Sequence, residues 1–286
     1  MYVRYELPRL TVAWGEDIDA DVSGVDMEKI RINVERIIGA CLEAFPGLED
    51  AKRAVVGFSG GKDSLVCALV SSTLLRDRFG WDVELVTVDP MIGGRHLWRP
   101  FLSTLKAMAD ALGARFEYVK LDVDVEKTAR SRDSPVCKVC SALRRRELAR
   151  RGDVILYGHT AEDALETLLL SASRARGAGT FPPAEVLEED DVFVLRPLYS
   201  VSEDRTERVY GRFLGVTGLD RVDPGCPHSK YSGGTPRALV REVIDAWKKR
   251  FPLRDEFVVE NAARGLGRMA LADVSSPLRD ELTRHL

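Results

Sequence analysis

The sequence lacks the features that define several classes of protein. Its 286 residues include five cysteines, and so small and odd a number argues against a secreted scaffold held together by disulfides. No hydrophobic run approaches the length of a membrane span, and residues 1–5 lack a signal-peptide pattern. Internal repeats and low-complexity segments are also missing. We therefore expect a protein of the reducing cytoplasm with no membrane partner.

The chain also lacks a strong charge of either sign. Its 42 Lys and Arg residues against 45 Asp and Glu residues give a net charge of −3. This balance argues against nonspecific coating of nucleic acid, although a local basic patch could still dock a structured RNA. With 45% hydrophobic and 30% charged residues, the composition is that of an ordinary globular protein with one good core.

The most informative segment is a glycine-rich loop between an apolar, strand-like run at 54–58 and a helix-like stretch at 65–70. Its residues are Ser59, Gly60, Gly61, Lys62, Asp63 and Ser64. Backbone N–H groups at the start of a helix attract anions, and glycine lets the main chain come close to phosphate oxygens. The lysine adds a point charge, and the serines add hydroxyl donors. The loop therefore predicts a phosphate site, with a simple capped turn as the competing interpretation.

This loop is not an ordinary P-loop, because Lys62 is followed by Asp63 where that motif has Ser or Thr. It resembles instead the PP-loop signature of the adenylating ATP pyrophosphatases. Those enzymes split ATP into AMP and pyrophosphate and leave AMP on an oxygen of the substrate. The resemblance implies that all six loop residues bind ATP, and that Asp63 orients ATP or its Mg²⁺.

A second motif begins at Cys137. It continues with Cys140, Ser141, Leu143, Arg144 and Arg145. Two cysteines at this spacing alone could bind a metal or a cluster, or form a redox dithiol. The whole Cys-x-x-Cys-Ser-x-Leu-Arg-Arg run resembles the tRNA thiolases of the two-thiocytidine and two-thiouridine group. In that group these cysteines carry a [4Fe-4S] cluster, and the resemblance implies Cys226 as the third ligand.

The metal itself has two candidates. Three cysteines would leave one iron of a cluster open to hydrosulfide or substrate. His228 lies two residues after Cys226, so a closed zinc site of three cysteines and one histidine is the alternative. The Cys-Pro-His-Ser form at 226–229 is closer to the two-thiouridine enzymes than to the two-thiocytidine enzymes. We expect Cys41 and Cys67 to be buried as small hydrophobic residues.

A third motif follows a strand-like run at 153–157. Gly158 and His159 precede the paired acids Glu162 and Asp163, as in the same family except for Glu162 in place of Asp. The resemblance implies that Gly158, His159 and Asp163 contact ATP, and such acids could help to hold Mg²⁺. The alternative is a capped helix with acids in its first turn, and both interpretations can hold at once. A fourth match is the Arg-Pro-Leu stretch at 196–198.

Strand-like and helix-like segments alternate between residues 51 and 200. The expected strands are 54–58, 83–88, 115–121, 154–157 and 192–195, with helices such as 101–112 and 141–150 between them. This alternation predicts an α/β fold with a parallel sheet covered by helices on both faces, as in Rossmann-like PP-loop proteins. Ligands of such sheets lie beyond the carboxyl ends of the strands, where Ser59, Asp89 and Gly158 stand. ATP should bind there.

Two further regions flank this expected ATP-binding domain at 51–200. Residues 1–50 predict an apolar hairpin near 2–14 and a helix over about 27–45. Residues 201–286 predict a helical region that contributes Cys226. Its apolar stripe is expected to pack in a core, and consists of Leu239, Val240, Val243, Ile244, Trp247 and Phe251.

These motifs together predict an ATP-dependent tRNA sulfurtransferase that adenylates the C2 oxygen of a pyrimidine and replaces it with sulfur. The expected catalytic residues are Lys62, Asp63, Cys137, Asp163 and Cys226. Arg144, Arg145 and Arg146 are candidate RNA contacts, with a solvated helix face as the alternative. Sulfur would come from free sulfide or a carrier protein, and the oligomeric state, a homodimer included, stays open. The rival functions are another PP-loop enzyme, such as an amidating synthetase or a tRNA lysidine synthetase, and a non-catalytic ATP-binding protein with structural zinc.

Overall fold

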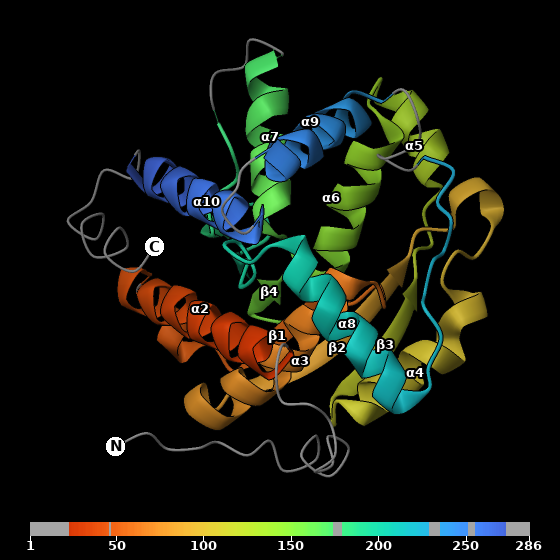
Figure 1. Ribbon diagram of the computed structural model, residues 1–286. Coiled ribbons are helices and arrows are strands. Elements are labelled where there is room, and N and C mark those ends of the chain that lie inside the picture. Colours follow the sequence, from red (N-terminus) through yellow and green to blue (C-terminus); the bar gives the residue numbers. More distant parts are fainter. Residues whose placement is uncertain (1–22, 46, 174–178, 229–234, 251–254, 273–286) are drawn as a thin grey trace.

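The computed structural model describes residues 23–45, 47–173, 179–228, 235–250 and 255–272 (Figure 1). The hairpin expected near residues 2–14 lies outside these ranges. Within them, no helix is both long enough and apolar enough to cross a membrane.

The centre of the molecule is a sheet of six strands in the order β3-β2-β1-β4-β6-β5. Their bounds are Arg53–Gly57 (β1), Asp82–Asp89 (β2), Arg115–Lys120 (β3), Val154–Leu156 (β4), Ala184–Leu187 (β5) and Val192–Leu195 (β6). All neighbouring strands pair in parallel except β5, which runs antiparallel to β6. The apolar run at 54–56 is fully buried because helices cover both faces of a parallel sheet. The predicted α/β fold is confirmed.

Helices fill the connections and the two flanking regions. They are α2 (Ser23–Ala44), α3 (Lys62–Phe79), α4 (Leu102–Ala111), α5 (Val125–Ser131), α6 (Val136–Ala149), α7 (Ala161–Ser173), α8 (Glu203–Thr217), α9 (Pro236–Arg250) and α10 (Asp255–Ala272). Short 3-10 turns occur at Leu48–Asp50 (η1), Ile92–Gly94 (η2) and Arg99–Phe101 (η3). α6 begins at Val136 rather than at Ser141, because Pro135 stands at its N-cap and starts the helix before the cysteines. Cys137 and Cys140 therefore lie in its first turns.

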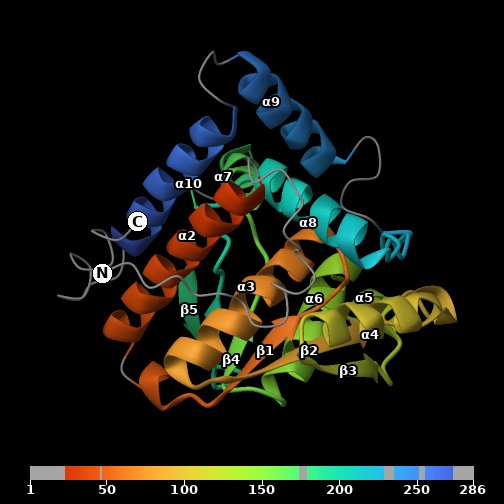
Figure 2. The ribbon, with the colours of Figure 1, turned by 60° about the horizontal axis from the view of Figure 1, so that its bottom comes forward.

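The two helical layers follow from the handedness of the crossovers. α3 links β1 to β2, whereas α6 lies on the path from β3 back across the sheet to β4. Right-handed crossovers in opposite directions place these helices on opposite faces of the sheet. α2 and α8 pack against α3 and complete its layer (Figure 2).

The C-terminal helices are attached to this core by both apolar and charged contacts. α9 and α10 share with α7 a small apolar cluster that includes Leu165, Ile244 and Val259. Leu239 and Val243 of the expected stripe are instead 55% and 60% exposed, so the prediction of core packing is wrong for these two residues, and Phe251 lies outside the described residues. The apolar face of α9 is wider than the surface that α7 and α10 cover, and these two residues lie at its uncovered edge.

A buried arginine joins three helices that lie far apart in the sequence. Arg205 of α8 is 2% exposed and donates to Asp26 of α2 at 2.5 Å and to Glu260 of α10 at 2.6 Å. Because a buried charge is costly unless it is paired, this triad fixes how the flanking helices sit against α8.

Candidate active site

The glycine-rich loop connects β1 to α3 at the carboxyl edge of the sheet. Gly60 has a φ of 75°, and a Cβ at this position would lie 2.5 Å from Leu105 Cδ2, so glycine suits it on both counts. The hydroxyls of Ser59 and Ser64 lie 3.0 Å apart across the loop. Tyr210 of α8 donates its hydroxyl to the Gly60 carbonyl at 2.9 Å and fixes the loop from the other side.

The loop after β4 touches the start of α3 directly. A Cβ on Gly158 would lie 2.5 Å from the carbonyl oxygen of Asp63 and 3.1 Å from the amide nitrogen of Ser64. Only glycine allows two main chains to approach so closely. The first and third motifs are therefore in contact through their backbones.

Lys62 lies between two carboxylates at the first turn of α3. Its Nζ is 2.8 Å from Asp63 Oδ2 and 2.8 Å from Glu203 Oε2, and the hydroxyl of Thr206 donates to Asp63 Oδ1 at 2.6 Å. Burial raises the pKa of Asp63 to about 6, in spite of the nearby lysine. Burial would also raise the pKa of Glu203. The positive charges of Lys62 and Arg241 outweigh this effect and hold the pKa of Glu203 below its ordinary value.

The acids of the third motif lie in an ion-pair network with α9. Arg237 and Arg241 each bind Glu166 at 2.7 Å, and Arg241 also binds Glu203. Lys248 binds Glu162 at 3.2 Å and Asp204 at 2.5 Å. Burial, with a further contribution from the charge of Glu203, raises the pKa of Glu162 to about 7.

Asp163 has a structural contact in addition to its predicted ATP role. Its Oδ2 accepts a hydrogen bond from the backbone N–H of Thr160 at 3.1 Å, as in the return contact of a capping box at a helix start. Its Oδ1 lies 4.0 Å from Arg237. The capping interpretation therefore holds, and the contact with ATP or Mg²⁺ stays a prediction.

Asp89 shapes the loop after β2. Its fully buried carboxylate accepts hydrogen bonds from the backbone N–H groups of Met91, Leu97 and Trp98 at 3.1–3.2 Å and from the Tyr118 hydroxyl at 2.7 Å. Burial alone would raise the pKa of Asp89, but these donors hold it below its ordinary value. With the carboxylate so fully used, Asp89 positions the loop residues, and its predicted contact with ATP is untested.

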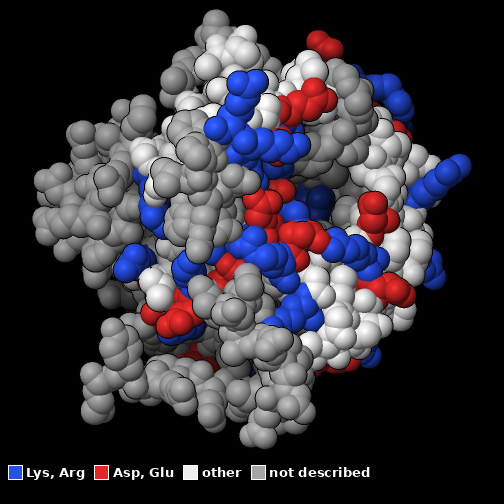
Figure 3. Space-filling model, viewed as in Figure 1, with Lys and Arg blue, Asp and Glu red and all other residues white. Residues whose placement is uncertain are grey.

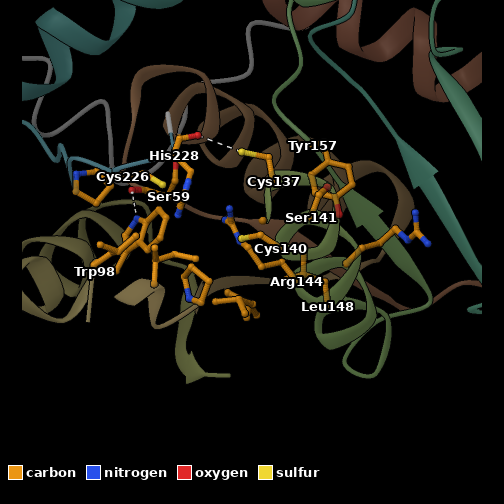
Figure 4. A pocket seen from close by; sticks show the side chains of 18 of the residues that line it. Ser59, Trp98, Cys137, Cys140, Ser141, Arg144, Leu148, Tyr157, Cys226 and His228 are labelled. Carbon is orange, nitrogen blue, oxygen red and sulfur yellow. Dashed lines mark hydrogen bonds between the residues drawn. The ribbon is translucent and has the colours of Figure 1, made fainter. Parts of the chain in front are cut away.

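A cavity of about 690 Å³ opens beside the glycine-rich loop, between α6 and the carboxyl ends of the strands (Figure 4). The predicted site residues that line it are Ser59, Cys137, Cys140, Arg144, Arg145, His159 and Cys226. Those that do not line it are Gly60, Gly61, Lys62, Asp63, Ser64, Asp89, Arg146, Gly158 and Asp163. The phosphate loop thus meets the cysteine cavity through Ser59, while its lysine and aspartate face the ion-pair network.

The three predicted cysteine ligands surround one end of this cavity (Figure 4). Cys137 is exposed, Cys140 and Cys226 are half-buried, and the Cys137 thiol donates to the His228 carbonyl oxygen at 3.1 Å. Burial raises the pKa of the Cys140 thiol. The positive charge of Arg144 opposes this rise, and the nearby thiols of Cys226 and Cys137 add to it. The three cysteines therefore line one shared cavity.

The three thiols form a donor set that a cluster can use. Within the described ranges, no three His, Cys, Asp or Glu side chains are placed to hold a single metal ion. A four-iron cluster accepts each thiolate on a different iron, so three separated sulfurs around an open cavity suit it. His228 Nε2 lies 2.9 Å from Glu126, so Nδ1 is the ring nitrogen that a zinc site would have to use.

The three arginines after the cysteines occupy three different environments. Arg144 lies over the Trp98 ring, 5.1 Å from its centre, while Arg145 pairs with Asp190 at 3.0 Å and Arg146 is exposed. Figure 3 shows Lys and Arg side chains interleaved with Asp and Glu at the centre of one face, near α8 and α9. Their role in RNA binding stays a prediction.

Several residues at the site carried no motif in the sequence. Glu203, Thr206 and Arg241 surround the loop lysine and aspartate, and Trp98 and Tyr157 line the cavity. One signal in the sequence could have identified Glu203. It lies five residues after the Arg-Pro-Leu stretch and directly after Ser202, at the start of a helix.

A family model described as a PP-loop domain matches residues 29–212. The chain belongs to the PP-loop family. The tRNA-cytidine(32) 2-sulfurtransferase of Cereibacter sphaeroides is 30% identical over 239 residues, which cover 80% of this chain and 77% of the relative. The tRNA-cytidine(32) 2-sulfurtransferase of Mesorhizobium japonicum is 31% identical over 252 residues, which cover 84% of this chain and 80% of the relative. These matches place this PP-loop protein in the tRNA-thiolation group, and the resemblance seen in the sequence is confirmed.

A solved structure shares the fold of this PP-loop protein. The U34-tRNA thiolase NcsA from Methanococcus maripaludis, solved with its [4Fe-4S] cluster, superposes with a TM-score of 0.61. It is 18% identical, and the match covers 85% of this chain and 79% of that one.

Proposed function

We propose that this protein is an ATP-dependent tRNA sulfurtransferase that replaces the C2 oxygen of a pyrimidine with sulfur. One observation carries the proposal: a single cavity is lined both by Ser59 of the PP-loop and by Cys137, Cys140 and Cys226. Such an arrangement allows activation of a base and delivery of sulfur to occur in one place. The names of the related 2-sulfurtransferases and of the NcsA thiolase support tRNA as the substrate.

The ATP step rests on the loop and the start of α3. Backbone N–H groups there and the Lys62 ammonium would stabilise the departing pyrophosphate, with Mg²⁺ on the phosphates. Lys62 is now bound by Asp63 and Glu203, so a phosphate oxygen would replace one of these carboxylates. Asp63 and Asp163 would then orient ATP or its metal. The base oxygen attacks the α-phosphate, AMP is transferred to it, and pyrophosphate leaves.

The sulfur step rests on the three cysteines, which would hold a [4Fe-4S] cluster. When bound, the cluster supplies an iron that no cysteine ligates, where sulfide can be held. Burial raises the pKa of the Cys140 thiol, and the positive charge of Arg144 beside it opposes this rise and so assists the thiolate form that ligation needs. Sulfur displaces the adenylated oxygen at C2, and AMP leaves with that oxygen. Free sulfide or a sulfur-carrier protein would supply the sulfur, and a persulfide on one of the cysteines is the competing carrier.

The rival functions make different demands on the same residues. An amidating or lysidine-type PP-loop enzyme needs the loop but has no use for three cysteines in its cavity. A zinc-bearing ATP-binding protein needs a fourth ligand, which would be Nδ1 of His228 because Nε2 contacts Glu126. The relatives named for cytidine 32 favour cytidine as the base, whereas the Cys-Pro-His-Ser form is nearer to the two-thiouridine enzymes.

Anaerobic reconstitution tests the proposal. The full chain, loaded with iron and sulfide, is incubated with unmodified tRNA, ATP, Mg²⁺ and sulfide, and the nucleosides are analysed by mass spectrometry. We expect a pyrimidine to gain the mass of sulfur in place of oxygen, with one pyrophosphate released per event. Cys226→Ser should abolish thiolation, while Cys67→Ala, at a buried position outside the cavity, should not. Pyrophosphate release without any thiolated nucleoside, or a colourless protein with stoichiometric zinc, would refute it.

A further inference from the structure

Glu126 connects three segments at the rim of the cysteine cavity. It belongs to the short helix α5, and no motif in the sequence included it. Its Oε1 lies 2.9 Å from His228 Nε2, and its Oε2 accepts a hydrogen bond from the Gly93 backbone N–H at 3.0 Å. One carboxylate therefore ties α5 to the loop after β2 and to the loop that bears Cys226.

His228 is held at both its side chain and its main chain. The ring contacts Glu126, while the carbonyl oxygen accepts the hydrogen bond from the Cys137 thiol at 3.1 Å. Figure 4 shows His228 beside Cys226, with the bond to Cys137 drawn across the cavity. The residue two positions after the third cysteine is thereby connected to the first cysteine.

Cys226 needs such support because it is not carried by a regular element. Cys137 and Cys140 lie on α6, whose backbone hydrogen bonds fix their positions, whereas Cys226 follows a turn at Asp223–Gly225 beyond the end of α8. Ordering an irregular segment costs conformational entropy, and a site loses affinity when its ligands must be ordered on binding. A contact close to Cys226 that exists before binding would remove much of this cost.

We propose that Glu126 and His228 are positioning residues that hold Cys226 opposite Cys137 and Cys140, so that the three thiols are arranged before any cofactor binds. The inference rests on the proposed function, because it gives these thiols a common ligand. It assigns His228 a role different from that of a fourth metal ligand. Removal of residues that orient metal ligands typically lowers metal affinity by about 10- to 100-fold.

The two roles of His228 predict different patterns among variants. If the contact positions the loop, Glu126→Ala and His228→Ala cause similar losses and the double variant is no worse than either. If His228 is a ligand, His228→Ala causes a much larger loss than Glu126→Ala. His228→Gln keeps a side-chain N–H that can donate to Glu126, so the positioning role predicts partial rescue.

The test measures iron retention and loop exchange in the full chain. After anaerobic reconstitution with iron and sulfide, each variant is challenged with a chelator, and iron loss is followed by absorbance. We expect loss at least tenfold faster in Glu126→Ala and His228→Ala. Hydrogen–deuterium exchange of residues 222–228 in the iron-free protein should also rise in both. Glu35→Ala, which removes a similarly exposed carboxylate of an ion pair on the distant α2, is the matched control and should change neither.

Unchanged exchange and iron retention in Glu126→Ala would overturn the inference, as would a loss confined to His228→Ala. A wild-type chain that holds no iron would contradict the proposed function instead. In that case the exchange measurement still decides whether Glu126 holds the loop, so the two failures are distinguishable.

Discussion

Replacing Gly158 by alanine tests whether contact between the two loops at the sheet edge sets the geometry of the ATP site. The added Cβ would lie 2.5 Å from Asp63 O and 2.7 Å from Asp63 C, where ordinary contact begins at 3.4 Å. Both atoms belong to the backbone at the start of α3, so no side-chain rotation relieves the clash. One of the two segments must move by roughly 1 Å, close to the displacement that can cost about 100-fold in rate.

Two measurements separate the effect on geometry from the effect on stability. We expect Gly158→Ala to lower the rate of pyrophosphate release about 100-fold, and to lower the free energy of unfolding in urea by about 1–3 kcal/mol through overpacking. Gly211→Ala is the matched control, because its Cβ would meet nothing within 4 Å on the exposed side of α8. That change should leave the rate unaltered and stabilise the helix by about 0.5–1 kcal/mol.

The result that would refute this reasoning is a Gly158→Ala protein with wild-type pyrophosphate release and wild-type stability. The loop and the start of α3 would then separate without consequence. A loss of stability with an unchanged rate would show that the contact supports the fold and leaves the alignment of ATP unaffected.

Three further changes test the charged groups. Burial, with a smaller contribution from the charge of Glu203, raises the pKa of Asp63 to about 6, so pyrophosphate release in wild type should fall on acidification near pH 6. Glu203→Gln removes the contribution of Glu203 and should move this fall to lower pH. Burial raises the pKa of Glu162 from 4.5 to about 7, so the folded state binds a proton more tightly than the unfolded chain, and stability falls as pH rises through this window. Urea unfolding of Glu162→Gln should lack that fall, and an identical pH dependence in both proteins would contradict the assignment. Arg205→Met leaves Glu260 buried without this cation, while Asp26 keeps its ion pair with Arg208. The change should cost about 3–5 kcal/mol in the free energy of unfolding, whereas a loss below 1 kcal/mol would show that the Arg205 contacts are not structural.

The parts of the fold that depend on local patterns were predictable from the sequence. Apolar runs between glycine-rich turns gave the positions of five strands, and the glycine-rich loop followed β1 as expected. The cysteines of α6 and Cys226 line one cavity that reaches the loop at Ser59. The strands and the loop rest on residues close in sequence or on the rule that parallel strands end at one edge, whereas the grouping of Cys226 with the other cysteines was implied by the family resemblance.

The remaining features depend on contacts between distant segments. β5 has four residues and pairs antiparallel at the edge of the sheet, so its sequence Ala-Glu-Val-Leu has no strong strand signal. The partners of Lys62 and Glu166 come from α8 and α9, and a list of charged residues does not specify which of them pair. Asp89 stands at a strand end as a ligand-binding acid would, but its oxygens are used by nearby backbone donors.

The cations of α9 lie beyond the stretch that matches the PP-loop domain, yet they neutralise Glu162, Glu166 and Glu203 beside the loop lysine. A helix outside the matched stretch thus contributes to the balance of charge beside the loop, which a triphosphate would meet in the proposed function. A relative that kept every loop residue but lost this helix would present bare carboxylates to ATP and repel it. Sequence comparison of such proteins should therefore weigh their distal helices when it assigns nucleotide affinity.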